Sequence, residues 1–231
     1  NHPHADACGA IGGRINATLR VDHVPLNARN TEDHSAYSAV IGQIHAGKDS
    51  ELLSQGNGFG WGNEPVKIFY KKWPGHATGS VFWTYERNLA KGNPDRRDIA
   101  YLVWGKLWDD ETDPGDAGLP LGTTFSYEIN VHRNTVHLAF NAEGQETVRY
   151  RIDLSSNTDA HGKVDSKDFG LGYTGDWFYF KAGLYNQCTV GPDARSPDCP
   201  GTGDWAIDEP NGDFGRVTFS KLELGEPVAV D

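Results

Sequence analysis

Methionine is absent from this sequence, cysteine is rare, and no long apolar run occurs. Because none of the 231 residues is methionine, the chain lacks an initiator residue, and we expect a processed product or an excised domain. A signal peptide is the segment we expect to have been removed, which indicates a secreted, extracellular protein of the bacterial type. No apolar stretch approaches the roughly 20 residues that cross a bilayer, so we expect a soluble protein that does not contact a membrane.

The three cysteines are Cys8, Cys188 and Cys199. Cys188 and Cys199 bracket a short loop that is rich in proline, aspartate and glycine. This close spacing favours a local disulfide, with free thiols as the alternative. Cys8 is left over, and we expect it to be unpaired.

Positive charge is in the minority, because 21 lysines and arginines face 32 acidic residues and the net charge is -11. Binding of nucleic acid needs a basic surface, so this balance excludes nucleic acid as a partner. An enzyme of polyanions is compatible with the total only if the charge is distributed unevenly. The basic side chains that we expect along a cleft are Arg20, Lys67, Lys71, Lys72, Arg87 and Lys181.

Ten segments of strand length alternate with clusters of Gly, Pro, Asn and Asp, and none sustains a helical period beyond a turn or two. The expected strands are 15–24, 37–46, 66–72, 80–86, 99–107, 123–132, 135–141, 146–154, 177–185 and 216–224. A chain of this length can form one all-β unit with a substantial core. We therefore predict a single domain, residues 1–231, folded as an antiparallel β-jelly-roll sandwich (concanavalin-like), with a barrel as the alternative.

The segment YFKAGLYNQ, residues 179–187, is expected to form a strand with reactive polar side chains on one face and apolar side chains on the other. Successive side chains of a strand point to opposite sides, so Lys181, Tyr185 and Gln187 share one face. Phe180, Ala182 and Leu184 share the opposite face and are expected to pack.

A second segment, VIGQIH at residues 40–45, repeats this design, because Gln43 and His45 are two apart and share a face. Together the two segments supply an imidazole, an amide, a phenol and an ammonium. These groups are suited to removing a proton beside a carboxylate and donating one to a departing oxygen. The combination indicates a lyase that acts on an acidic sugar.

These segments resemble the alginate lyases of polysaccharide lyase family 7 and of the closely allied family 18. The resemblance rests on VIGQIH, on YFKAGLYNQ and on NATLRVD at residues 16–22, with looser support from IFYKKWPG. The motifs lie near opposite ends of the chain, so the resemblance covers nearly all of it. NATLR departs from the family 7 pattern of Arg, Ser or Thr, Glu, Leu or Ile, and Arg. Only its closing residue, Arg20, matches, whereas Asn16 and Thr18 hold positions alone on the same strand face.

The resemblance implies β-elimination on a 1,4-linked uronate polymer, which here means alginate, with no metal or other cofactor. Gln43 and Arg20 would neutralise the substrate carboxylate. Tyr185 would protonate the leaving oxygen and, where the C5 hydrogen lies on its own side, would first act as the base. His45, with a free pKa of roughly 6.5, would be the base when the hydrogen lies on the opposite face.

A tyrosine with a free pKa of roughly 10 is a poor base at neutral pH, so a nearby cation such as Lys181 is needed to stabilise the phenolate. The side chains expected to contact substrate without taking part in the chemistry are Asn16, Lys71, Lys72, Lys181 and Gln187. The resemblance also implies endo-acting cleavage, and we expect a monomer.

Two other functions compete with elimination. A glycoside hydrolase on a similar sandwich needs paired carboxylates, and the strand 128–133 has Asn130 and Arg133 where acids would be required. A noncatalytic carbohydrate-binding module could use exposed tryptophans such as Trp61, Trp73 or Trp83, but would not need His45 and Tyr185. The acidic loop 109–116 does not have the spacing of a calcium-binding EF-hand, and we expect a solvated loop there.

Overall fold

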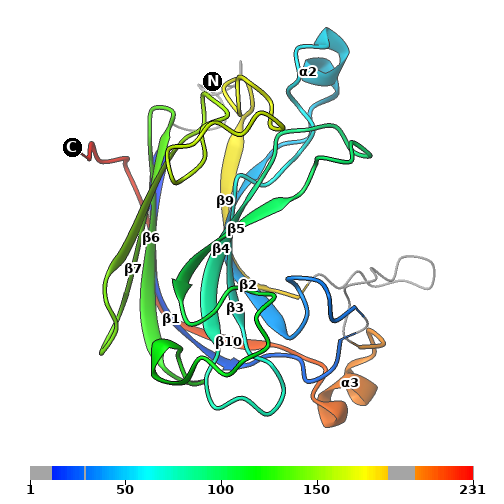
Figure 1. Cartoon of the computed structure of the whole chain (residues 1–231), viewed down its shortest axis with the longest axis vertical. Coiled ribbons are helices and arrows are strands. Elements are labelled where there is room, and N and C mark those ends of the chain that lie inside the picture. The colour runs from blue at the N-terminus through cyan, green and yellow to red at the C-terminus, as the bar shows by residue number, and fades with distance from the viewer. Residues whose placement is uncertain (1–11, 29, 187–200, 231) are drawn as a thin grey trace.

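The computed structural model describes residues 12–28, 30–186 and 201–230, and two antiparallel five-stranded sheets dominate it (Figure 1). The back sheet has the strand order β10-β1-β6-β7-β8, and the front sheet has the order β5-β4-β3-β2-β9. The strands are β1 Gly13–His23, β2 Ser38–Ala46, β3 Val66–Lys71, β4 Ser80–Glu86, β5 Asp98–Trp104, β6 Thr124–His132, β7 Thr135–Ala142, β8 Val148–Asp153, β9 Phe178–Tyr185 and β10 Arg216–Gly225. Each overlaps an expected segment, so the predicted all-β antiparallel sandwich is confirmed.

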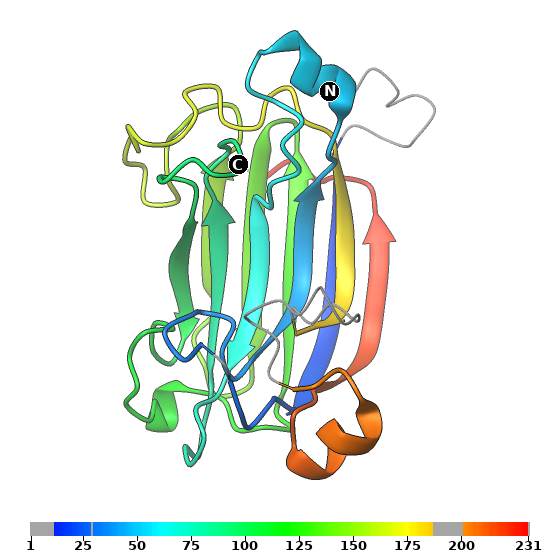
Figure 2. The same cartoon turned by 90° about the vertical axis from the view of Figure 1, so that its right-hand side faces the viewer.

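Strands that are distant in sequence lie side by side in both sheets. β1 pairs with β10 in the back sheet, and β2 pairs with β9 in the front sheet. Figure 2, which faces the front sheet, shows β2 in blue beside β9 in yellow. The pairing of β2 with β9 therefore brings the segments VIGQIH and YFKAGLYNQ together.

The core lies between the sheets and is filled by one contiguous cluster of apolar side chains. Along β1, Ile15, Ala17, Leu19 and Val21 are buried, while the residues that alternate with them are at least partly exposed. Burial of a large aliphatic side chain stabilises the fold by about 2 kcal/mol. This alternation therefore turns the polar residues of β1 away from the core, and hence away from the front sheet.

The front sheet is covered on both faces over part of its area. Strands β3 and β4 are buried at every position. A second apolar cluster of Val40, Phe69 and Phe82 packs beneath Ala100 and Trp108. The outer face of the front sheet is therefore shielded from solvent over β3 and β4.

An irregularity in β2 determines which way the following residues face. The register of β2 shifts between Val40 and Gly42 against both of its neighbours. At this point Tyr127 of the back sheet donates a hydrogen bond to the carbonyl oxygen of Ile41 at 3.0 Å. A Cβ atom on Gly42 would lie 2.5 Å from the Tyr127 hydroxyl oxygen, so only glycine fits without displacement. Beyond the irregularity, Ile44 packs in the core, and its two neighbours in sequence point outward.

Short helices connect some of the strands: α2 Ser50–Gln55, α3 Trp205–Asn211 and the 3-10 turn η1 Gly115–Ala117. Helices of 6 and 7 residues are too short to show a helical period in the sequence, so they were not predicted. They lie at opposite ends of the front sheet (Figure 2). In the part of the chain that the structure describes, no helix has the length and apolar character needed to cross a membrane.

Candidate active site

The neighbouring strands β2 and β9 form the floor of a pocket on the outer face of the front sheet. Gln43 lies opposite Lys181, and His45 lies opposite Tyr179. The pocket has a volume of about 490 Å³. It is lined by Val40, Ile41, Gly42, Gln43, His45, Glu64, Phe180, Lys181, Ala182, Gly183, Leu184 and Tyr185.

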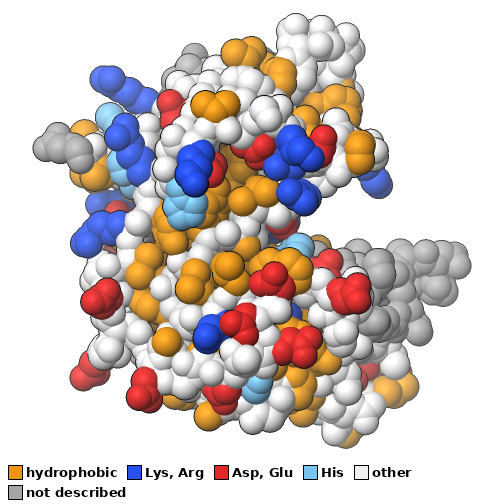
Figure 3. All heavy atoms as spheres, viewed as in Figure 1, with side chains coloured by type: hydrophobic (Ala, Val, Ile, Leu, Met, Phe, Trp, Pro, Cys, Tyr) orange, Lys and Arg blue, Asp and Glu red, His pale blue; other side chains and the backbone are white. Residues whose placement is uncertain are grey.

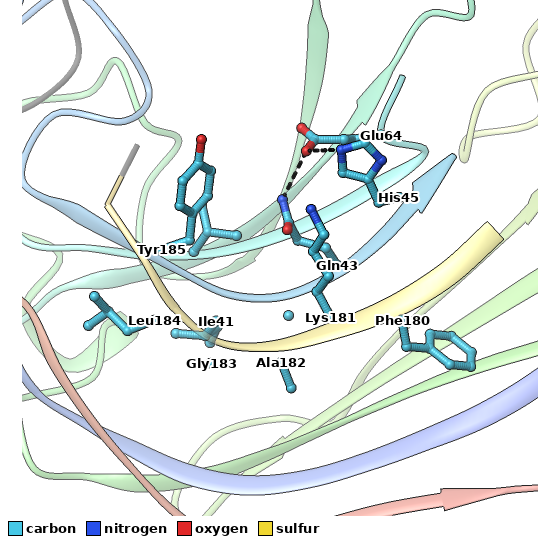
Figure 4. A pocket seen from close by; sticks show the side chains of 12 residues that line it. Ile41, Gln43, His45, Glu64, Phe180, Lys181, Ala182, Gly183, Leu184 and Tyr185 are labelled. Atoms are coloured by element: carbon cyan, nitrogen blue, oxygen red, sulfur yellow. Dashed lines mark hydrogen bonds and ion pairs between the residues drawn. The ribbon is translucent and has the colours of Figure 1, made fainter. Parts of the chain in front are cut away.

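Four of the predicted site residues meet in this pocket: Gln43, His45, Lys181 and Tyr185. Figure 4 shows them rising from the strands on one side, whereas Ala182 and Phe180 point the other way. Phe180, Ala182 and Leu184 pack against the core, as the alternation along YFKAGLYNQ predicts. Tyr185 is 44% exposed and lines the pocket, so it is accessible to a ligand there.

The surface is hollowed on the side that the front sheet faces, between the end that carries α2 and the end that carries α3 (Figure 3). In this view lysine and arginine side chains gather above the hollow, and acidic side chains gather below it. The charge of this acidic protein is therefore distributed unevenly around the groove. Such a distribution allows a local potential that differs from the total charge.

Both ring nitrogens of His45 face oxygen atoms. Nδ1 lies 2.6 Å from the carbonyl oxygen of Ala46, and Nε2 lies 3.2 Å from Oε1 of Glu64. The ring also stacks on Tyr179, with 5.2 Å between the centroids and 18° between the planes. These three contacts fix the orientation of the imidazole at the edge of the pocket.

Glu64 is a pocket residue that the sequence analysis missed. Its Oε1 accepts a hydrogen bond from the Gln43 amide nitrogen at 3.3 Å as well as facing His45, and its Oε2 lies 3.0 Å from Nζ of Lys67. The segment around Glu64 is rich in glycine and asparagine, a composition that predicts a turn and gives no sign of a chemical role. Glu64 lies just before β3, and β3 pairs with β2 in an antiparallel arrangement. This position in the sequence was the one indication that Glu64 lies near Gln43 and His45.

Lys67 connects Glu64 to a second carboxylate. Its Nζ lies 2.7 Å from Oδ2 of Asp98, and that oxygen is also 3.0 Å from Nε2 of His34. Burial opposes the charged form of Lys67, but Asp98, Glu64 and Glu86 outweigh burial and raise its pKa. Burial likewise opposes the charge of Asp98, yet Lys67 and His34 lower its pKa to about 2. Glu64, Lys67 and Asp98 therefore form a charged row on the front sheet, in which the groups hold one another in place.

Lys181 contributes a cation that is not committed to a carboxylate. Its Nζ lies 5.3 Å from the centroid of the Tyr179 ring. Within the described residues it forms no ion pair, in contrast to Lys67. The ammonium group is therefore available to an anionic ligand.

The prediction that Arg20 joins His45 and Tyr185 in one site is wrong. Arg20 lies on β1 in the back sheet, where its side chain is 49% exposed and its Nε is 2.6 Å from Oδ1 of Asp22. Asn16 lies on the same outer face of the back sheet. Alternation correctly predicted that Asn16 and Arg20 share a face, but that face belongs to the other sheet. No arginine is present among the described residues that line the pocket.

The expected contributions of Lys71 and Arg87 to the cleft are also wrong, because neither lines the pocket and both are buried, whereas Lys72 lies outside this pocket and its substrate contact stays a prediction. Lys71 is buried and donates hydrogen bonds from Nζ to the carbonyl oxygens of Ala36 at 2.6 Å and Asp33 at 3.3 Å. Burial lowers the pKa of Lys71 to about 8. The Lys72 backbone amide binds the Tyr37 carbonyl at 3.0 Å.

Arg87 binds Asp165 through Nε at 2.7 Å and is buried. Its role in the structure is therefore to hold a loop. Gln187 and the three cysteines lie outside the described residues, so the substrate contact of Gln187 and the disulfide between Cys188 and Cys199 stay predictions. In residues 12–28, 30–186 and 201–230, no cluster of three or more His, Cys, Asp or Glu side chains is arranged to hold a metal ion.

Comparisons with known proteins bear on this pocket. The sequence model of a family described as alginate lyase matches residues 3–226. A curated alginate lyase from Klebsiella pneumoniae is 31% identical over 186 residues, which are 79% of this chain and 51% of that protein. The chain thus spans about half the length of the curated relative that it matches.

Two solved structures share the fold. The crystal structure of the exolytic PL7 alginate lyase AlyA5 from Zobellia galactanivorans has a TM-score of 0.76 and 32% identity, covering 96% of this chain and 75% of that one. The crystal structure of the alginate lyase from Klebsiella pneumoniae has a TM-score of 0.61 and 28% identity, covering 97% of this chain and 64% of that one. Both similarities extend over nearly the whole length of the present chain.

Proposed function

The chain belongs to the alginate lyases of polysaccharide lyase family 7, and from this premise we propose that it cleaves alginate by β-elimination in the pocket between β2 and β9. The observation that carries the proposal is the meeting of His45, Gln43, Lys181 and Tyr185 around one pocket on the outer face of the front sheet. Two strands from distant parts of the sequence supply these groups.

The reaction breaks the C5–H bond of a uronate unit, forms a double bond between C4 and C5, and expels the glycosidic oxygen from C4. Its difficult step is the build-up of negative charge beside a carboxylate that is already anionic. Hydrogen-bond donors and cations aimed at that carboxylate lower the barrier, because they stabilise the charge as it develops. Gln43 and Lys181 perform this task in our proposal, and Lys181 takes the place given to Arg20 from the sequence.

Tyr185 and His45 divide the proton transfers. When the C5 hydrogen faces away from Tyr185, His45 takes the proton from C5, and the Tyr185 hydroxyl gives its own proton to the departing oxygen. When the hydrogen faces Tyr185, the phenolate takes the C5 proton and then passes it to that oxygen. One pocket can thereby act on both epimers of the uronate.

A direct test mixes the protein with alginate and follows two signals, the ultraviolet absorbance of the conjugated double bond and the number of new reducing ends. Elimination predicts that both signals rise together. New reducing ends without absorbance would indicate hydrolysis and would refute the proposal. Binding without either signal would indicate a noncatalytic carbohydrate-binding module.

We also propose that cleavage is endo-acting, the mode typical of the family. The relative AlyA5 is described as exolytic, which makes exo cleavage the second candidate. The size of the products early in the reaction separates the two modes. An endo enzyme lowers the viscosity of alginate steeply and releases oligomers, whereas an exo enzyme releases small unsaturated sugars while the viscosity falls slowly. Secretion and a monomeric state stay predictions from the sequence.

A further inference from the structure

The Glu64 carboxylate lies inside the pocket and is neither the acid nor the base of the proposed reaction. We propose that Glu64 is a positioning residue, which holds the His45 ring and the Gln43 amide in the orientations that elimination needs and stabilises the positive charge on His45 after proton transfer. This inference rests on the proposed function. It assigns Glu64 a task that neither the sequence motifs nor the pocket lining alone indicates.

The contacts of His45 determine where its proton lies. A distance of 2.6 Å between Nδ1 and the Ala46 carbonyl oxygen requires a proton on Nδ1, because two lone pairs at that distance would repel. The 3.2 Å contact between Nε2 and Oε1 of Glu64 is attractive only when Nε2 also carries a proton, so it is the contact of the imidazolium that the reaction creates. Proton transfer from C5 to Nε2 would give an imidazolium next to the carboxylate. Glu64 therefore stabilises the charge that the reaction creates on His45.

The same carboxylate oxygen orients Gln43. Oε1 of Glu64 can only accept a hydrogen bond, so the atom of the Gln43 amide that lies 3.3 Å away is the nitrogen. An amide nitrogen carries two hydrogens, and Glu64 uses one of them. The second hydrogen is left to bind a substrate carboxylate. Without Glu64 the amide could turn its oxygen toward the substrate and repel it.

Glu64 is itself held by Lys67 and by Glu86. Its Oε2 lies 3.0 Å from Nζ of Lys67, and its backbone N–H donates to Oε2 of Glu86 at 2.8 Å. Lys67 in turn lies 2.7 Å from Asp98. These contacts hold the carboxylate in place before substrate arrives. The Lys67 ammonium also offsets a negative charge that would otherwise repel a polyuronate.

The test compares Glu64→Gln with Glu143→Gln, a matched loss of one negative charge at an exposed position between β7 and β8. We expect Glu64→Gln to lower kcat by about tenfold to a hundredfold with KM changed by less than about threefold, since the loss of a residue that orients a catalytic group has effects of that order. Glu143→Gln should match the wild type. If kcat is kept and KM falls, Glu64 merely competes with the substrate carboxylate, and the proposal is overturned.

A second variant protects the test against misfolding. Glu64→Asp keeps the charge that faces Lys67 but withdraws the oxygen from His45 by one methylene, so it should fold and still lose kcat. A folded Glu64→Asp variant with full kcat would contradict a positioning role.

Nitrogen NMR of the His45 ring separates this inference from the proposed function. The His45 signals are assigned by their loss in His45→Ala, and both ring nitrogens should shift in Glu64→Gln, whether or not the protein cleaves alginate. Unchanged ring signals would overturn the role of Glu64 even in an active lyase. Conversely, a wild-type protein that releases no unsaturated product would refute the proposed function and leave the NMR result to decide the role of Glu64.

Discussion

Gln43 and His45 reach the pocket because they occupy alternate positions of β2, with the buried Ile44 between them. Their identity and their shared face could both be predicted from six residues of sequence. Glu64 could not, because its contacts depend on how the β2–β3 hairpin is paired. A residue in a glycine-rich turn gives no periodic signal, so its chemical role becomes visible only when the partner side chains are placed.

Single cations on opposite faces of the molecule should differ in their effect on substrate binding. Lys181→Gln removes the ammonium group that lines the pocket, and we expect KM for alginate to rise about tenfold, since a hydrogen bond to a charged group is worth about 1.5–3 kcal/mol. Steady-state kinetics on alginate at fixed ionic strength provide the measurement.

Arg20→Gln is the matched control, because it removes one positive charge from the outer face of the back sheet. We expect kcat and KM within about twofold of the wild type, because a charge on that face is screened from the pocket. A loss of activity as large as that of Lys181→Gln would show that Arg20 reaches the substrate after all.

At the scale of elements, strand positions were predictable and sheet membership was not. Alternation along 16–20 correctly placed Asn16, Thr18 and Arg20 on one face of β1, the exposed one. It could not show whether β1 belongs to the front or the back sheet, because alternation shows which residues share a face and does not show which strands lie beside them. The misplacement of Arg20 and Asn16 follows from this limit, whereas β2 and β9 were placed together by the resemblance of their motifs.

The contact between the sheets at Gly42 allows a prediction about β2. Gly42→Ala introduces a methyl group 2.5 Å from the Tyr127 hydroxyl oxygen, so we expect the free energy of unfolding to fall by about 1–3 kcal/mol. Because Gln43 follows directly, kcat should fall as well. Denaturant unfolding and kinetics measure the two effects.

Gly170→Ala serves as the control for Gly42→Ala, since a Cβ at Gly170 meets no atom within 4 Å. That variant should retain wild-type stability and activity. If Gly42→Ala behaves in the same way, the packing of Tyr127 against β2 does not constrain the pocket.

At the scale of the whole molecule, the charged row on the front sheet couples stability to pH. The pKa of Asp98 is about 2 in the folded protein, against a value of about 3.9 in an unfolded chain. A lowered pKa means that the stabilisation by this carboxylate is fully present above about pH 4 and is lost as the pH falls toward about pH 2. Asp98 therefore contributes about 2 kcal/mol at neutral pH.

We expect Asp98→Asn to be less stable than the wild type at neutral pH and to lose less stability between about pH 4 and pH 2. Denaturant unfolding across this range measures the difference, and Asp116→Asn in η1 controls for the change in net charge. Parallel pH dependences of the wild type and Asp98→Asn would contradict the ion pair with Lys67.

The overall fold and the family could both be predicted from the sequence, because the alternation within strands and the motifs on β2 and β9 can be recognised without the structure. The layout of charge was not, because total composition does not show which lysines are buried. Lys71 and Lys67 illustrate this, since the first binds backbone carbonyls and the second is enclosed by carboxylates. Only Lys181 of the predicted basic residues faces the pocket with its charge uncommitted to an acid within the described residues.

The central claim is that Tyr185 supplies the proton for elimination in this pocket. The most direct measurement compares the wild type with Tyr185→Phe on the same alginate, following the absorbance of the new double bond, the affinity for a uronate oligomer and the melting temperature. The account predicts an unchanged melting temperature, an affinity within about threefold of the wild type, and a rate at least about a hundredfold lower. A folded Tyr185→Phe variant that forms unsaturated product at close to the wild-type rate would contradict it.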